Sequence, residues 1–150
     1  MRSCAVALLI TLLCCTVLPA QSTPPKPPSP FDAQAASRLL LQLNEALQGH
    51  SRNQFLALFD LAKMKDGSVF KQQINSFFSQ TESIRAHLNL ADTSIDGEKA
   101  TITVDAEMEA EPSNGGAVSR RNDRLNFVVA ASGNNWKFID LQPRSFFSLP

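Results

Sequence analysis

An aspartate stands within an aromatic strand pattern near the end of the chain, at residues 136–141. Strand side chains alternate between two faces, so Trp136, Phe138 and Asp140 are predicted to share one face. Burial among aromatic rings raises the pKa of a carboxyl group and suits it to acid or base chemistry. Two interpretations stay open: Asp140 is the acid of a pocket, or it lies at a rim and binds a donor such as Arg144.

A second candidate acid, Asp60, follows the predicted second helix, where the alternative is an exposed carboxylate at the helix end. The sequence does not contain the sets of residues that metal, phosphate-binding or serine-nucleophile sites need. His50 falls between two predicted helices and His87 is predicted to face Asp105 on a solvated strand surface, so they do not form the ligand set of a zinc site. No phosphate-binding glycine loop or nucleophilic serine motif is present. We therefore predict no metal site and no cofactor.

The first 22 residues are typical of a secretory signal peptide. Arg2 precedes an apolar run over 4–18, and cleavage is expected after one of two small residues, Ala20 or Ser22. The run falls short of the roughly 20 residues that span a membrane. All three cysteines lie in this segment, so the mature chain has no disulfide. We expect export to the periplasm or the extracellular space, with no membrane attachment after cleavage.

Residues 23–30 form a proline-rich linker, expected to be a stiff tether, with a proline-motif ligand as the alternative. Residues 31–150 are expected to form one domain. The sequence has 14 basic and 14 acidic residues, so nucleic acid is not an expected partner. Apolar residues at helical spacing predict three helices, with Ser29 capping the first, Gly49 ending it and Ser51 capping the second.

After residue 80 the apolar period changes to two and predicts four strands, at 84–90, 100–108, 125–131 and 136–141. The strands are joined by turns, and matching apolar residues across each turn fixes the expected registers. The predicted pairs are Leu90 with Ile102, Val104 with Phe127, Val129 with Phe138, Phe127 with Asp140 and, on the outer face, Glu107 with Arg124.

Three helices followed by a long four-stranded meander resemble the nuclear transport factor 2-like superfamily. The likeness is carried by the helix pair at 43–47 and 55–60 and by the ending at 133–141, and it covers residues 31–147. It implies an α+β fold in which three N-terminal helices pack on a strongly curved, four-stranded antiparallel sheet. The resulting cone would have an apolar pocket, and two chains would form a homodimer sheet against sheet.

The superfamily includes ketosteroid isomerases and polyketide cyclases beside non-catalytic proteins, so the fold leaves the function open. Its isomerases combine an aspartate base with a tyrosine and a second acid, and this chain has no tyrosine. The tail residues Phe146 and Phe147 are expected to fold back into the cone or to pack in a dimer. The residues predicted to line a pocket, if the cone is not filled by its own side chains, are Met108, Leu125, Phe127, Trp136, Phe138 and Asp140.

The sequence therefore predicts an exported, non-catalytic module that binds a small apolar ligand or a protein partner. The alternative is a proton-transfer enzyme, of the isomerase or cyclase type, that uses Asp140 as its acid or base. Cavity volume and the direction of the Asp140 side chain distinguish these two hypotheses.

Overall fold

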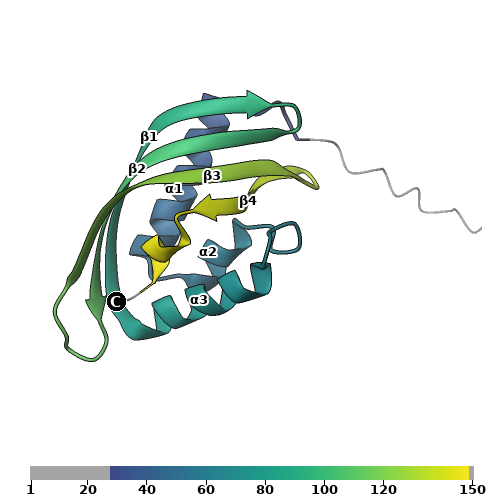
Figure 1. Ribbon diagram of the computed structural model, residues 1–150. Helices are drawn as coiled ribbons and strands as arrows, with labels where there is room; N and C mark the ends of the chain where they lie inside the picture. The colour runs from purple at the N-terminus through teal and green to yellow at the C-terminus, as the bar shows by residue number, and fades with distance from the viewer. Residues whose placement is uncertain (1–27, 149–150) are drawn as a thin grey trace, which may run out of the picture.

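The computed structural model describes residues 28–148, so the predicted signal peptide and residues 23–27 of the linker lie outside the described residues. The four strands form one antiparallel sheet in the order β1-β2-β3-β4. The sheet bends strongly around the helices (Figure 1), which confirms the α+β cone predicted from the sequence. The elements are α1 (Ala33–Gln48), α2 (Arg52–Ala57), α3 (Gly67–Gln80), β1 (Thr81–Asp96), β2 (Lys99–Pro112), β3 (Ser119–Ser132), β4 (Asn135–Gln142) and the short 3-10 helix η1 (Arg144–Phe147).

The helix ends follow local capping chemistry. α1 begins later than predicted, because Asp32 and not Ser29 is the N-cap: its carboxylate accepts a hydrogen bond from the Ala35 amide at 2.7 Å. Gly49 ends α1 as predicted. Ser51 is the N-cap residue of α2, although its side chain makes no capping hydrogen bond.

The edge strand β4 is covered by the segment that follows α2. Phe59 forms a parallel bridge with Phe138. The Phe138 amide donates to the carbonyl oxygen of Leu58 at 2.9 Å, and the Asp60 amide donates to the Phe138 carbonyl at 2.8 Å. These bonds satisfy backbone groups at the sheet edge and explain why α2 is short. They also fix Asp60 beside β4.

Two of the predicted registers are wrong by two residues. Leu90 pairs with Val104 rather than Ile102, and Val104 pairs with Leu125 rather than Phe127. A two-residue error leaves every side chain on its predicted face, so the inward residues of β2 and β3 are still buried. On the outer face the ion pairs move accordingly, and they join Arg124 to Asp105 at 2.8 Å and Arg120 to Glu109 at 2.7 Å.

A bulge changes the register between β3 and β4. Val129 pairs with Phe138 as predicted, but the neighbouring Val128 pairs with Asp140, which leaves Ile139 without a partner. Two residues of β4 therefore oppose one of β3, and the side chains beyond the bulge change faces. The predicted pairing of Phe127 with Asp140 is wrong for this reason.

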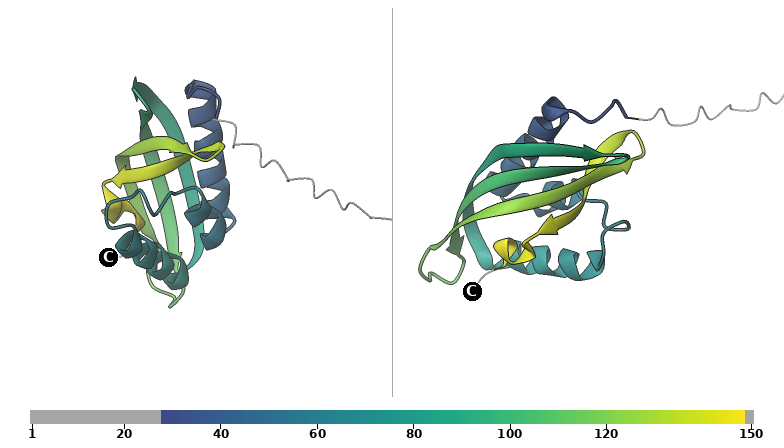
Figure 2. Two further views of the ribbon diagram at one scale, coloured as in Figure 1. Left: turned by 90° about the vertical axis from the view of Figure 1, so that its right-hand side faces the viewer. Right: turned by 45° about the horizontal axis from the view of Figure 1, so that its top comes forward.

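The helices and the inner face of the sheet share one apolar core, which extends from Phe31 to Phe147. α1 packs along β1, and η1 lies beside α3 at one end of the cone (Figures 1 and 2). Among residues 28–148, the helices are too short or too polar to cross a membrane.

Candidate functional site

Phenylalanine rings fill the interior of the cone. Ring centroids lie 4.8 Å apart for Phe127 and Phe138 and 5.2 Å apart for Phe55 and Phe147. A side chain with no accessible surface borders no void that a water molecule can enter, so the space beside these rings is packed. Four residues predicted to line a pocket, Met108, Leu125, Phe127 and Phe138, belong to this core. The rings with at most 1% of their surface exposed are those of Phe55, Phe70, Phe77, Phe127, Phe138 and Phe147.

The C-terminal segment folds back and closes one end of the cone. η1 buries both Phe146 and Phe147. Arg121 Nη1 donates to the carbonyl oxygen of Phe146 at 2.9 Å, and Gln73 Nε2 donates to that of Arg144 at 2.6 Å. The sequence left two arrangements open for the tail, folded back into the cone or packed in a dimer, and the tail is folded back into the cone.

Asp140 lies at the rim of the cone and not inside it, because the bulge gives Leu141 the interior position opposite Phe127. The Asp140 side chain is 35% exposed and accepts a hydrogen bond from Arg144 Nη2 at 2.9 Å. Partial burial alone would raise the pKa of Asp140. The hydrogen bonds from Arg144 and from the Leu141 amide outweigh this effect and hold the pKa below its usual value. Asp140 is therefore an ionised rim residue bonded to Arg144.

Asp60 has partners of its own. Ser132 Oγ donates to the Asp60 carboxylate at 2.8 Å, and Lys63 Nζ lies 3.7 Å from it. The bond from Ser132 lowers the pKa of Asp60 against the opposing effect of burial. Within residues 28–148 no hydrogen bond joins Asp60 to Asp140. Both candidate acids are ionised at neutral pH, and neither is held protonated as a proton donor.

The two histidines lie in different parts of the fold. His50 Nε2 lies 3.2 Å from Thr81 Oγ1, and its ring packs edge-on against Phe78. His87 pairs with Glu107 on the outer face, not with Asp105 as predicted. Within the described part of the chain, no three His, Cys, Asp or Glu residues come together as a set of metal ligands.

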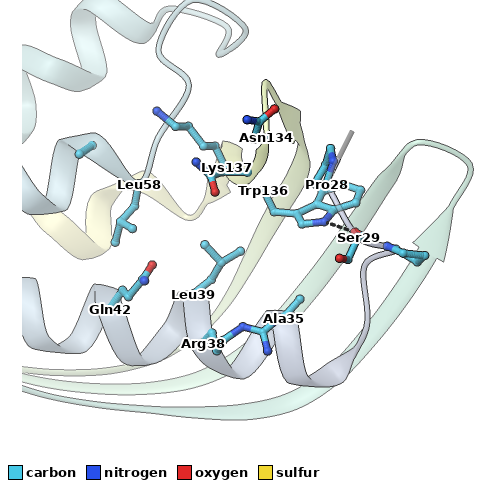
Figure 3. Close-up of a pocket in the computed structure, with 13 residues that line it drawn as sticks. Pro28, Ser29, Ala35, Arg38, Leu39, Gln42, Leu58, Asn134, Trp136 and Lys137 are labelled. Atoms are coloured by element: carbon cyan, nitrogen blue, oxygen red, sulfur yellow. Dashed lines mark hydrogen bonds between the residues drawn. The ribbon is translucent and has the colours of Figure 1, made fainter. Parts of the chain in front are cut away.

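A surface groove of about 400 Å³ lies beside Trp136, between α1, residues 28–30 and the β3–β4 hairpin (Figure 3). The indole Nε1 of Trp136 donates to the carbonyl oxygen of Ser29 at 2.8 Å. The ring of Phe31 packs against the indole, with centroids 5.0 Å apart. Trp136, predicted to line a pocket inside the cone, instead forms a wall of this groove.

Hydrogen-bond donors surround the groove. Arg38 and Gln42 come from α1 and Lys137 from β4. Arg38 and Lys137 form no ion pair with any residue in 28–148. The sequence missed all three, because the apolar pattern of α1 assigns Arg38 and Gln42 to solvent and no local pattern shows that the linker returns to Trp136. The single tryptophan beside a proline-rich stretch is the signal that could have suggested the groove.

Comparisons with known proteins support the fold and nothing narrower. No protein-family model matches the chain, and no curated protein matches it. Solved structures do match. A nuclear transport factor 2-like superfamily protein from Salmonella enterica serovar Typhimurium shares 12% identity over 72% of this chain and 86% of its own, with a TM-score of 0.63. A conserved protein from Planctomyces limnophilus shares 15% identity over 72% of this chain and 91% of its own, with a TM-score of 0.61.

A third match is a type 2 hexachlorocyclohexane dehydrochlorinase, with 9% identity over 72% of this chain and 80% of its own and a TM-score of 0.58. At such identities a structural likeness establishes a shared fold, and the function has to be argued from the site. The curved sheet, the order of its strands and these matches together show that the chain has the nuclear transport factor 2-like fold.

Proposed function

We propose that this protein is an exported binding module without catalytic activity, and that it binds its ligand in the surface groove beside Trp136. The observation that carries the proposal is the packed interior of the cone, which leaves no room for a substrate beside the phenylalanine rings. The groove, in contrast, combines an aromatic wall with several polar groups, which is the usual composition of a ligand site. Export rests on the signal-peptide pattern of residues 1–22.

The charge state of the candidate acids also favours binding over catalysis. A general acid or base works best with a pKa near the operating pH, which for a carboxyl group means a raised pKa. The pKa values of Asp140 and Asp60 are lowered instead. The chain has no tyrosine to assist either residue.

The second candidate function is a proton-transfer enzyme that uses Asp140. It is favoured by one observation, that a dehydrochlorinase has the same fold. Under this hypothesis Asp140→Asn abolishes turnover of any substrate found, whereas unchanged turnover would eliminate it.

The proposal is tested by ligand mapping on the isotopically labelled chain from Thr23 onward. A library of small fragments and a ketosteroid are titrated in, and nuclear magnetic resonance shifts are followed at the Trp136 indole, at Arg38 and Gln42, and at the methyl groups of the interior residue Leu125. We expect fragments to shift the groove resonances and the ketosteroid to leave the Leu125 methyls unchanged.

The matched control is Val118→Ala, which changes an exposed side chain that is absent from the groove lining. This variant should keep all fragment binding, whereas Trp136→Ala should lose it. Saturable shifts at Leu125 on addition of the ketosteroid would show an accessible interior and overturn the proposal.

A further inference from the structure

The surface around Trp136 carries an excess of positive charge. Among residues 28–148, the lining of the groove includes Arg38 and Lys137 and no acidic residue. A second groove of about 600 Å³ adjoins the first, and Trp136 lines both. Its charged residues are two basic and one acidic: Lys63, Lys99 and Glu98. The whole sequence has 14 basic and 14 acidic residues, so this excess is a local property of the surface.

The two cations of the first groove have no counter-charge within the chain. Arg38 and Lys137 form no ion pair with any residue in 28–148. Lys63 in the second groove differs, because its Nζ lies 3.7 Å from the Asp60 carboxylate. The remaining parts of the sequence contain no Asp or Glu side chain that could pair with Arg38 or Lys137. These two charges are therefore available to an anion from outside the chain.

The two cations stand on opposite walls of a hollow. Arg38 comes from α1 and Lys137 from β4, and Figure 3 shows α1 and the β3–β4 hairpin on opposite sides of the groove. Lys65 and Lys71 also form no ion pair within the described part of the chain, but they lie outside both grooves. Their position beside a concave surface thus distinguishes Arg38 and Lys137 from ordinary surface cations.

The Trp136 indole supplies an apolar wall that is held in place. Its Nε1 donates to the Ser29 carbonyl at 2.8 Å, and the Phe31 ring packs edge-on against it. Because this donor is already used, the indole offers a ligand its ring and not a hydrogen bond. Leu39 and Leu58 add apolar surface. A volume of about 400 Å³ lies near the lower end of the range for small-molecule sites, which suits a ligand with one ring.

We propose that the Trp136 groove binds a small aromatic carboxylate, with its ring against Trp136 and its carboxylate held by Arg38 and Lys137. This names the ligand class of the site in the proposed function and rests on it. Hydrogen bonds between a cation and a carboxylate are shorter and stronger than neutral ones, and a guanidinium can donate two of them in parallel. The charge therefore selects the ligand, and the ring adds apolar contact area.

The test uses phenylacetate as the probe and the chain from Thr23 to Pro150. Because the sequence has one tryptophan and no tyrosine, fluorescence and the indole N–H resonance report on the groove alone. Phenylacetamide has the same ring without the charge, and acetate has the charge without the ring. We expect phenylacetate to bind at least tenfold more tightly than either. Raising the salt concentration from about 0.1 M to about 1 M should weaken phenylacetate binding and leave phenylacetamide binding unchanged, since salt screens exposed charges.

Two double variants locate the charge that matters. Arg38→Gln/Lys137→Gln should bind phenylacetate and phenylacetamide equally. The matched control, Lys65→Gln/Lys71→Gln, loses the same two charges outside the grooves and should keep the full preference for phenylacetate. An unchanged indole N–H resonance in both unliganded variants shows that the bond from Trp136 to Ser29, and with it the groove, is intact.

Equal affinity of the unaltered chain for phenylacetate and phenylacetamide, or no binding of either, would overturn the ligand class. An equal loss of preference in both double variants would overturn Arg38 and Lys137 as its binding groups. A tetraglutamate peptide is the last probe, and tighter binding of it than of phenylacetate would replace the aromatic carboxylate by an acidic peptide. The proposed function survives these results if other fragments still shift the groove resonances, and it fails separately if the ketosteroid shifts Leu125.

Discussion

The ring of Phe147 stands among Phe55, Phe77 and Phe146, with centroid distances from 5.1 to 6.1 Å. Phe147→Ala would leave a cavity at this point, and we expect the free energy of unfolding to fall by about 3–5 kcal/mol in urea denaturation. Because an apolar cavity of this kind binds small aromatic molecules, benzene should restore part of the loss.

The control for this experiment is Val69→Ala on α3, where the side chain is 60% exposed. Its effect should stay within about 0.5 kcal/mol. A Phe147→Ala variant as stable as the unaltered protein would contradict a filled cone.

The ion pair of Asp140 predicts a pH dependence. Its folded-state pKa lies below the value of about 3.9 for an unfolded aspartate, so its contribution to stability is present above that pH and is lost as the pH falls through the folded pKa. Asp140→Asn should cost about 0.2–1 kcal/mol at neutral pH, because the pair is partly exposed, and nothing in strong acid. Urea denaturation at several pH values measures the difference.

An acid–base role would give Asp140 the opposite behaviour. If a carboxyl-detected titration found a pKa above the usual aspartate value, the ion-pair assignment would be wrong. The matched control is Asp92→Asn, which removes an exposed carboxylate on β1.

Asp140 also marks the limit of sequence reasoning at the residue scale. The sequence identified it as unusual and named Arg144 as a donor, and the ion pair is present. Its direction was predicted wrongly, because alternation assumes an unbroken strand and no local signal marks Ile139 as the extra residue.

At the scale of elements, the start of α3 depends on a glycine. A Cβ at Gly67 would lie within 2.1 Å of the carbonyl oxygen of Leu61, so even alanine requires the backbone to move. We expect Gly67→Ala to lower the free energy of unfolding by about 1–3 kcal/mol, the cost of overpacking. Thermal or urea denaturation checks this value.

Gly97 provides the comparison, because a Cβ there meets nothing within 4 Å but its φ is +60°. Gly97→Ala should cost about 1–2 kcal/mol through backbone strain alone. If the rest of the structure is unchanged, the backbone around Leu61 should move in the Gly67→Ala variant and not in the Gly97→Ala variant. An unmoved backbone at Leu61 in the Gly67→Ala variant would contradict the close contact.

The strand pairings show which errors of register change the face on which a side chain lies. The registers of β1–β2 and β2–β3 were predicted two residues away from the observed ones, yet Ile102, Val104 and Phe127 are buried as expected. The period of two fixes the face of a residue but not its partner, so hydrophobic matching cannot detect an error of two. The one-residue bulge in β4 is the case in which the face itself changes.

At the scale of the whole molecule, the predicted export limits the mature N-terminus to two positions. Cleavage after Ala20 leaves a chain that begins at Gln21, and cleavage after Ser22 leaves one that begins at Thr23. Expression in a secreting host followed by intact-mass measurement should find one of these two forms. A full-length protein retained in the cells would contradict export.

The homodimer proposed from the family resemblance can be tested by light scattering. A dimer that packs sheet against sheet would use the outer face, which carries the exposed ion pairs of Arg124 with Asp105 and Arg120 with Glu109. Both pairs join residues of one chain, so they neutralise this face without requiring a partner. We expect a dimer in solution, and a monomer would contradict the proposal.

The fold could be predicted from the sequence because its apolar periods and turn residues agree along the whole domain. The Trp136 groove could not, since its walls come from the linker, α1 and a hairpin that meet only in three dimensions.

The bulge in β4 has a consequence in genetic terms. Ile139 is the residue that the bulge adds to the strand, and Phe138 and Leu141 are the inward residues on either side of it. Loss of the Ile139 codon would leave Phe138, Asp140 and Leu141 alternating as in an unbroken strand, with Asp140 still outside. A one-codon gain in such a strand is thus absorbed by the bulge, so that Asp140 keeps its outward position and Leu141 keeps its place in the core.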